Sequence, residues 1–375
     1  MKILLLSNYL NHHQAPLCDC LAARCGEFLF VETGKMPQER VRLGYPRVYR
    51  DYCIQAWEEP DLVKERLRTA DVVIAGAAPE AMVRQRIRTG KLLLRYSERL
   101  FKQGPELLKY LPRLLRFRWR NPPGKPVWLL CAGTYVAEDY GRFGLFREKS
   151  LQWGYFPEMK RYDIHNLMEK KNPREILWCG RLLDWKRPMD ALEAAARLQK
   201  RGLSFHLTFL GDGEQKQMLL DQVRDRRMEP WIDFLGPLPP ERVRRRMETA
   251  GIFLFTSGAQ EGWGAVLNEA MNSGCGVIAS SAAGATGFLV EDQKNGLVFE
   301  PGNMEELTEN LYRLLIDPAL QQRLGKAAYE TIVGLWNPET AAQRLVMTAE
   351  SIISENPLPN WTSGPCSLEK GNRQV

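Results

Sequence analysis

The sequence predicts an α/β protein made of two Rossmann-like domains, each built on a parallel sheet. Its 375 residues are enough for two domains at about 100–200 residues each. Continuous apolar runs such as 2–8 and 71–76 do not alternate with polar residues, which is typical of strands buried on both faces. The second half repeats this alternation of strand and helix, and its run 251–255 leads into a glycine-rich loop and a helix.

The order of elements supports a division into two halves. In the first half we expect strands at 2–8, 28–31, 71–76, 91–96, 127–132 and 150–157, and helices at 16–25, 61–69, 79–89 and 106–120. In the second half we expect strands at 175–180, 205–211, 231–236, 251–255, 276–280 and 296–300, helices at 188–199, 239–250 and 265–271, and two more within 304–333.

These elements predict an N-terminal domain over 1–165 and a C-terminal domain over 170–338, joined by a linker at 160–173. A helix at about 339–354 is expected to pack back on the first domain. Residues 355–375 are rich in Pro, Gly, Asn and Ser, which predicts a flexible tail.

The positive charge of the chain is concentrated in one segment. The formal net charge is +7, and residues 81–126 contain 13 Lys or Arg against 2 Glu. No zinc-finger, RRM or basic-zipper pattern accompanies this charge, so a nucleic-acid partner is not expected. An anionic membrane surface or a phosphorylated acceptor would explain it.

The eight cysteines are scattered without a C-x-x-C pair, which predicts buried thiols in a reducing compartment. The N-terminal apolar run is too short for a signal-peptide core, and no run approaches the ~18 apolar residues of a spanning helix. The expected location is the cytoplasm, with peripheral contact to the inner face of the plasma membrane as an option.

The stretch TSGAQEGWGAVLNEAMNSG, over 256–274, carries the strongest functional signal. Glycines allow a ligand to approach the backbone, and the amides at a helix N-terminus favour an anion. Glu261 in the loop and Glu269 on the helix would accept hydrogen bonds from hydroxyl groups. A nucleotide sugar combines a diphosphate with sugar hydroxyls on one side and ribose hydroxyls on the other.

The Glu-x7-Glu spacing within EGWGAVLNEAM resembles the retaining glycosyltransferases of the GT-B fold, in particular the large family 4. The resemblance covers 175–335 well and is looser before that. It implies two domains facing a deep cleft, a hexosyltransferase type of activity, retention of configuration and transfer without a metal ion. The alternative is that both glutamates are ordinary helix and cap residues.

The loop after the strand 175–180 also matches the family, which has a Gly-Arg followed by a Lys five residues beyond the Arg. Arg181 and Lys186 fit this pattern, and both could stabilise a leaving diphosphate. An ordinary basic loop is the alternative. The resemblance implies that Glu261 acts on the sugar, that Glu269 holds the ribose, and that the other donor-binding residues are Gly262, Trp263, Gly264, Ala265, Val266, Leu235 and Gly236.

Acceptor-side residues are expected at the ends of two strands of the first domain, because ligands of α/β sheets bind there. After the first strand come Asn11, His12 and His13, where relatives usually carry a Gly-Gly loop that this chain lacks. After the strand 91–96 come Ser97 and Glu98, near a position where many relatives place a histidine. His13 and Glu98 are therefore catalytic candidates. A helix-capping loop, and for Glu98 a cap or a salt bridge to Arg99, are the alternatives.

The segment 106–120, ELLKYLPRLLRFRWR, alternates apolar and basic residues at helical spacing. It resembles an interfacial helix that rests on anionic lipid, or an amphipathic helix packed on the sheet. With the rest of 91–126 it favours a polyprenyl-diphosphate-linked or glycan acceptor, as in the synthesis of bacterial surface polysaccharides.

Two other functions fit parts of the pattern. A nucleotide-sugar epimerase would share the architecture, and a non-catalytic nucleotide-sugar-binding regulator would explain the missing Gly-Gly loop. The dinucleotide fingerprint fails because Lys216 stands where a third glycine is required. No D-x-D triplet or zinc spacing is present, so neither a metal nor another cofactor is expected. The identities of the sugar, the nucleotide and the acceptor do not follow from the sequence.

Overall fold

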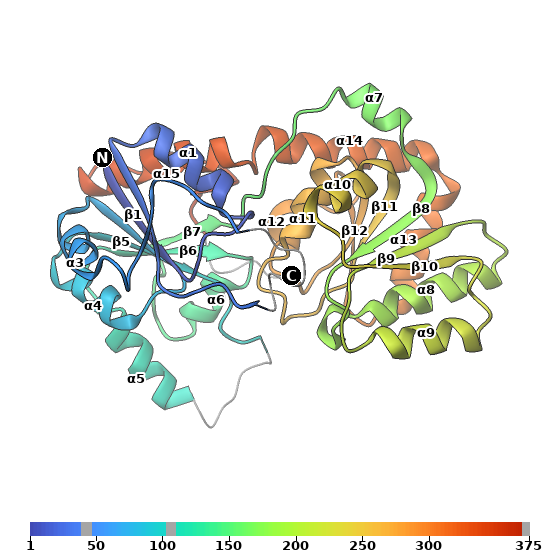
Figure 1. Cartoon of the computed structure of the whole chain (residues 1–375), viewed down its shortest axis with the longest axis horizontal. Coiled ribbons are helices and arrows are strands. Elements are labelled where there is room, and N and C mark those ends of the chain that lie inside the picture. Colours follow the sequence, from blue (N-terminus) through green and yellow to red (C-terminus); the bar gives the residue numbers. More distant parts are fainter. Residues whose placement is uncertain (39–46, 103–109, 370–375) are drawn as a thin grey trace. The chain divides into compact units, whose positions relative to one another are not determined.

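The computed structural model describes residues 1–38, 47–102 and 110–369, and the chain forms two compact units (Figure 1). Unit 1 comprises Met1–Glu158 and the chain from Trp336 onward, and unit 2 comprises Met159–Leu335. Each unit has a parallel sheet between helices, so the predicted fold class of two Rossmann-like α/β domains is confirmed.

The described part of unit 1 contains a seven-stranded parallel sheet in the order β3-β2-β1-β4-β5-β6-β7. The strands are β1 (Lys2–Ser7), β2 (Glu27–Glu32), β3 (Cys53–Gln55), β4 (Val72–Ala75), β5 (Leu92–Ser97), β6 (Val127–Ala132) and β7 (Ser150–Trp153). The helices are α1 (Ala15–Arg24), α3 (Pro60–Thr69), α4 (Glu80–Arg88), α5 (Tyr110–Arg120), α6 (Val136–Gly141) and α15 (Pro338–Ile353). The three-residue β3 was not predicted, because it is too short to show a pattern. The first residues of the helix expected over 106–120 lie outside the described ranges.

Unit 2 has a six-stranded parallel sheet in the order β10-β9-β8-β11-β12-β13. The strands are β8 (Asn172–Cys179), β9 (His206–Leu210), β10 (Ile232–Gly236), β11 (Ala250–Phe255), β12 (Gly276–Ser280) and β13 (Leu297–Phe299). The helices are α7 (Ile164–Glu169), η2 (Asp184–Lys186), α8 (Pro188–Lys200), α9 (Lys216–Asp225), α10 (Pro240–Thr249), α11 (Ala265–Asn272), α12 (Thr286–Leu289), α13 (Met304–Ile316) and α14 (Pro318–Gly334).

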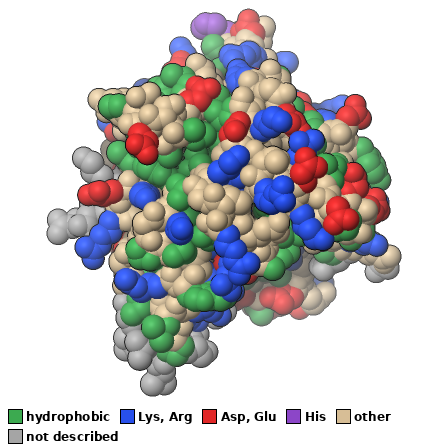
Figure 2. All heavy atoms as spheres, turned by 90° about the vertical axis from the view of Figure 1, so that its left-hand side faces the viewer, with side chains coloured by type: hydrophobic (Ala, Val, Ile, Leu, Met, Phe, Trp, Pro, Cys, Tyr) green, Lys and Arg blue, Asp and Glu red, His purple; other side chains and the backbone are tan. Residues whose placement is uncertain are grey.

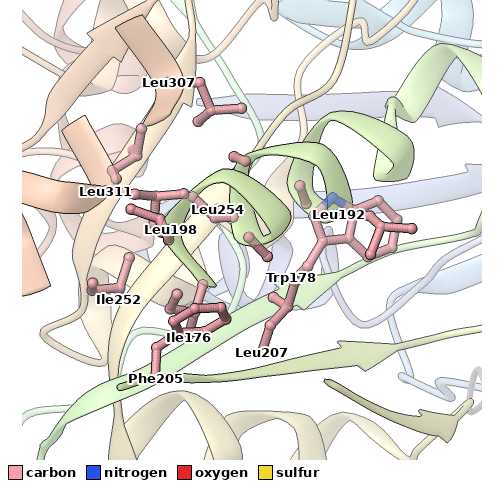
Figure 3. Packing of buried hydrophobic residues seen from close by; sticks show 14 of the residues in the cluster. Ile176, Trp178, Leu192, Leu198, Phe205, Leu207, Ile252, Leu254, Leu307 and Leu311 are labelled. Atoms are coloured by element: carbon pink, nitrogen blue, oxygen red, sulfur yellow. The ribbon is translucent and has the colours of Figure 1, made fainter. Parts of the chain in front are cut away.

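In unit 2 the strand order reverses between β8 and β11, and this determines where loops meet. The two strands are direct neighbours, with Ile252 beside Ile176 and Leu254 beside Trp178. Their carboxyl ends therefore lie at one edge, at the point where open α/β sheets bind ligands. Below this edge, α8 and α13 pack against the sheet through residues such as Leu192, Leu198 and Leu311 (Figure 3).

The boundary between the units lies earlier than predicted. Residues 160–173, expected to be a linker, instead form α7 and the start of β8 within unit 2. The backbone of Lys160 exchanges two hydrogen bonds with the Asn272 side chain, at 2.8 and 2.9 Å. The backbone of Tyr162 makes two more with the Tyr329 hydroxyl. Because these contacts are made by a polar segment with weak periodicity, the sequence pattern did not reveal them.

The chain returns to unit 1 after Leu335. Helix α15 packs against α1, and the residues that follow run beside β7. Cys366 donates its backbone N–H to the Gln152 carbonyl at 2.8 Å, and Leu368 lies opposite Leu151 in an antiparallel bridge. The prediction of a flexible tail is therefore wrong for this stretch, since backbone pairing fixes it on an edge strand. The end of the predicted tail, 370–375, lies outside the described residues.

Arg86 is a fully buried cation in unit 1. It is 0% exposed, and its guanidinium donates to the carbonyl oxygens of Leu67, Ala70, Asp71 and Leu92 at 2.7–3.2 Å. Burial lowers the pKa of Arg86 to about 10. The residue thus joins the end of α3 to α4 and to the start of β5.

Replacing this arginine by an apolar residue should destabilise unit 1. In Arg86→Met the four carbonyl groups lose a buried donor, and we expect the free energy of unfolding to fall by about 3–5 kcal/mol. Arg88, an exposed residue on the same helix α4, supplies the control. Arg88→Met should change the free energy of unfolding by less than about 0.5 kcal/mol. Urea unfolding followed by circular dichroism measures both, and equal effects of the two changes would contradict the assigned role.

Candidate donor site and acceptor-side residues

The loops after β8 and β11 are joined by hydrogen bonds at the point where the strand order of unit 2 reverses. The Gly258 amide donates to the Trp185 carbonyl, and the Thr256 hydroxyl donates to the Lys186 carbonyl, both at 2.8 Å. Thr256 in turn accepts from the Trp178 indole at 2.9 Å. These bonds fix the two loops, which are far apart in sequence, relative to each other.

Lys186 and Glu261, both predicted as catalytic, form an ion pair between these loops. The Glu261 carboxylate is buried, and it also accepts from the Ser257 hydroxyl at 3.0 Å. The Lys186 ammonium group lies 4.6 Å from the centre of the Trp185 ring. A buried carboxylate requires such partners to stay ionised, so the pair holds one charge of each sign at a defined place.

The predicted anion site at the start of α11 has the expected backbone geometry. Gly264 precedes the helix with a φ of 98°, and a Cβ there would lie 2.2 Å from the Phe255 ring. No side chain caps the helix, and among the residues that the structure describes no acceptor binds the amides of Ala265 and Val266. Two amides and the helix dipole are therefore directed at one place, which favours an anion.

Trp263 differs from the simple expectation of a ligand contact. Its ring is 1% exposed, and its indole N–H donates to Asn268 at 2.8 Å. Its carbonyl oxygen accepts from the amide of Ala285, in the second glycine-rich turn. Any contact of the Gly262–Gly264 segment with a ligand must therefore come from the backbone, because the indole packs inside the unit.

Glu269 and Lys186 both act on the Cys179 thiol at the end of β8. The pKa of this thiol is raised to about 12, chiefly by burial and also by the charge of Glu269, while the charge of Lys186 lowers it. Arg181 follows two residues later with an exposed side chain, and within the described ranges its guanidinium forms no ion pair. Two carboxylates and two cations thus belong to one edge of the sheet.

Leu235 and Gly236 lie at the end of β10, on the same edge. The Gly236 carbonyl accepts from the Gly211 amide at 2.9 Å, and the Leu235 side chain is exposed. A Cβ at Gly211 would lie 1.9 Å from the Gly180 carbonyl oxygen, so only glycine allows these loops to cross. β10 and β11 are three strand spacings apart, roughly 14 Å, so a ligand touching both ends must be extended.

In unit 1, the loop with the two histidines is ordered by hydrogen bonds of Asn11 just before α1. Asn11 accepts at its side-chain oxygen from the amides of His13 and Gln14, at 3.0 and 3.2 Å. The rings of His12 and His13 lie 3.9 Å apart between centres. The N-cap residue of α1 is Gln14, whose side chain makes no capping hydrogen bond, so a capping role of the loop and the acceptor-side roles of Asn11, His12 and His13 stay predictions.

Ser97 and Glu98 lie at the carboxyl end of β5 within a hydrogen-bonded cluster. Glu98 accepts from the Tyr155 hydroxyl at 3.0 Å and pairs with Lys102 at 2.6 Å, so the alternative of a salt bridge to Arg99 is wrong. Ser97 accepts from the Tyr140 hydroxyl at 3.1 Å. Glu98 is thus available as a partly exposed, positioned carboxylate.

Sequence reasoning missed residues that position the predicted ones. Asp139 is buried on α6 and accepts from the amides of Leu100 and Phe101 at 2.7 and 3.1 Å, which fixes the loop after Glu98. Burial raises the pKa of Asp139, against the effect of these amides and of Arg99. Ser257 was missed as a Glu261 partner. Only the position of Ser257 four residues before Glu261 could have indicated its role.

The described residues contain no group of three or more His, Cys, Asp or Glu side chains arranged to hold a metal ion. Transfer without a metal stays a prediction. Among the same residues, no helix has both the length and the apolar character needed to cross a bilayer. All eight cysteines are free thiols.

Known proteins resemble this chain in sequence and in fold. Residues 160–331 match the family model described as "Glycosyl transferases group 1". HepE from Anabaena, solved in complex with UDP, superposes with a TM-score of 0.68 over 94% of this chain and 100% of HepE, at 18% identity. Glycogen synthase from Mycobacterium tuberculosis is 29% identical over 46% of this chain, and AmsK from Erwinia amylovora, an amylovoran biosynthesis glycosyltransferase, is 31% identical over 43%.

The two sheets thus form the GT-B fold that the sequence predicted. More narrowly, residues 160–331, which make up most of unit 2, are similar to the glycosyl transferase group 1 family. The matched region spans about two fifths of the two curated relatives, 41% of the glycogen synthase and 40% of AmsK.

The close approach at Gly264 predicts a large effect of one added methyl group. In Gly264→Ala the strained φ and the contact with Phe255 should lower the free energy of unfolding by about 2–4 kcal/mol. Gly202→Ala is the matched control, since Gly202 has a φ of 77° and a methyl group added there would have nothing within 4 Å; it should cost about 1 kcal/mol. Equal losses in urea unfolding would show that the Phe255 contact is unimportant.

Proposed function

We propose that this protein transfers a sugar from a nucleotide-diphosphate sugar to a hydroxyl group of an acceptor. The observation that carries the proposal is the Lys186–Glu261 pair at the loop that leads into the uncapped start of α11, in a domain similar to the glycosyl transferase group 1 family. A diphosphate needs cations and amides, whereas sugar rings need hydrogen-bond acceptors, and this edge supplies both.

The donor would extend along the carboxyl edge of the unit 2 sheet. The diphosphate would lie at the amides of Ala265 and Val266, with Glu269 on the ribose and the end of β10 on the base. The span of roughly 14 Å between β10 and β11 suits an extended nucleotide sugar. HepE, which has the same fold, was solved with UDP, and we propose UDP or GDP as the nucleotide class.

The ion pair suggests how the site responds to its ligand. Lys186 neutralises Glu261 in this structure, and an arriving diphosphate would compete for the ammonium group. Glu261 would then be available to the sugar hydroxyls and would favour positive charge at the anomeric carbon. Arg181 and Lys186 would stabilise the negative charge that develops on the diphosphate as its bond to that carbon breaks.

The acceptor is proposed to be a glycan or a polyprenyl-diphosphate-linked sugar of bacterial surface polysaccharide synthesis. Its hydroxyl oxygen would form the new bond to the anomeric carbon, with retention of configuration and without a metal ion. Glu98 or His13 would take the acceptor proton, and Asn11, His12 and Ser97 would bind nearby groups. The biosynthetic role of AmsK supports this acceptor class. Contact with the cytoplasmic face of an anionic membrane would bring such an acceptor within reach.

Removing either cation should slow the transfer step. A thermal-shift panel of nucleotide sugars first identifies a donor, and single-turnover reactions then use that donor. Lys186→Ala and Arg181→Ala should each lose roughly 10²–10³ in rate, by analogy with single preorganised donors to a developing charge. Lys200→Ala removes an exposed lysine at the end of α8 and should leave the rate unchanged.

A loss of less than tenfold in Arg181→Ala would count against its assigned role. The same reaction separates the other functions. Conversion of the donor in the absence of any acceptor would indicate an epimerase. Tight donor binding without turnover on any lipid-linked or glycan acceptor would indicate a binding regulator.

A further inference from the structure

Helix α5 of unit 1 carries apolar side chains on two sides. Leu114 and Phe117 pack inward with Phe101 and its neighbours, which anchors the helix to the unit. Leu115 and Trp119 are nevertheless 64% and 56% exposed. They are four residues apart and so lie next to each other along the helix. Packing within the described residues therefore does not account for this second apolar side.

Arginines surround these two side chains. Arg116 and Arg118 are exposed on α5 itself. From α4, Arg84 places its guanidinium 3.7 Å from the centre of the Trp119 ring, and Arg88 follows one turn later with an exposed side chain. We call these four arginines together with Leu115 and Trp119 the α5 patch. Lys and Arg side chains are spread over the face of the molecule shown in Figure 2.

The positive charge of the α5 patch is not compensated locally. Across the described ranges, none of its four arginines forms an ion pair. Glu80, the carboxylate at the start of α4, is engaged by Arg95 at 2.9 Å and by Arg120 at 3.5 Å. An exposed tryptophan and leucine among four arginines match the boundary of a bilayer, where acyl chains lie beneath anionic headgroups.

We infer that the α5 patch docks on an anionic lipid bilayer. Each arginine near such a surface contributes about fivefold in affinity, and insertion of Leu115 and Trp119 adds an apolar contribution. A second copy of the chain is a poorer occupant, because a symmetric contact would place four arginines against four. The inference rests on the proposed function in one respect, because a lipid-linked acceptor would be found in a bilayer. Docking itself is measured without sugar transfer.

The test is co-sedimentation of the full chain with vesicles of phosphatidylcholine alone or mixed with phosphatidylglycerol. Binding is expected to require phosphatidylglycerol and to weaken with salt. Leu115→Ser with Trp119→Ser, and separately Arg116→Glu with Arg118→Glu, should each weaken it at least about tenfold. Unchanged thermal melting of each variant shows that its fold is intact.

Two controls match these changes elsewhere on the chain. Ile316→Ser alters a side chain on α13 that is 53% exposed, and Arg242→Glu with Arg245→Glu reverses two exposed charges on α10. Both should bind vesicles like the unchanged protein. Weakening of binding by the controls as strongly as by the α5 changes would overturn the assignment to this patch.

Three further results would overturn the inference. They are absence of vesicle binding, binding to DNA or another polyanion in place of vesicles, and self-association that the α5 changes abolish. Its failure is distinguishable from failure of the proposed function. Vesicle binding without any sugar transfer would support the docking inference and contradict the proposed transferase function. Sugar transfer to a soluble acceptor without vesicle binding would support the transferase function and contradict the docking inference.

Discussion

The candidate site of unit 2 depends on one buried ion pair, between Lys186 after β8 and Glu261 after β11. The strand order of the sheet reverses between β8 and β11, which makes these two strands direct neighbours. The sheet topology therefore brings Lys186 and Glu261 together, although they are 75 residues apart in sequence. A buried carboxylate without a cation would be costly. The pair therefore makes the conformation of each loop depend on the other, and it holds a positive group against the loop that leads into α11.

Glycines at this edge determine how closely the loops approach. A side chain at Gly211 would meet the Gly180 carbonyl, and one at Gly213 would meet the backbone of Leu182. The loops after β8 and β9 therefore cross in direct backbone contact, and the Asp212 carbonyl accepts from the Leu182 amide. The surface beside Arg181 is thus built from main chain in close contact, and the cationic side chains of Arg181 and Lys186 project from it.

The sequence was informative wherever a signal is local. Apolar runs predicted every strand of unit 2, because burial of a strand shows in consecutive residues. The spacing of Glu261 and Glu269 indicated the candidate site, because both residues lie close together in one loop and helix. Contacts between distant residues were not predictable. Asp139 holds the Glu98 loop from α6, and Asn272 holds the backbone of Lys160 from α11. The sequence around Asp139 and Asn272 does not indicate these contacts, because a hydrogen bond between residues far apart in the chain produces no periodic pattern in a single sequence.

Unit 1 is assembled from two stretches of chain, and this has a consequence for its formation. Unit 2 is continuous, so it can fold as soon as Leu335 has left the ribosome. The first stretch of unit 1 is made earlier, yet until α15 and the strand-like stretch around Cys366 emerge, one side of α1 and the outer edge of β7 have no cover. Residues 1–158 therefore complete their fold only after the chain from Trp336 onward has been synthesised. During that interval their uncovered apolar surface is accessible to a chaperone.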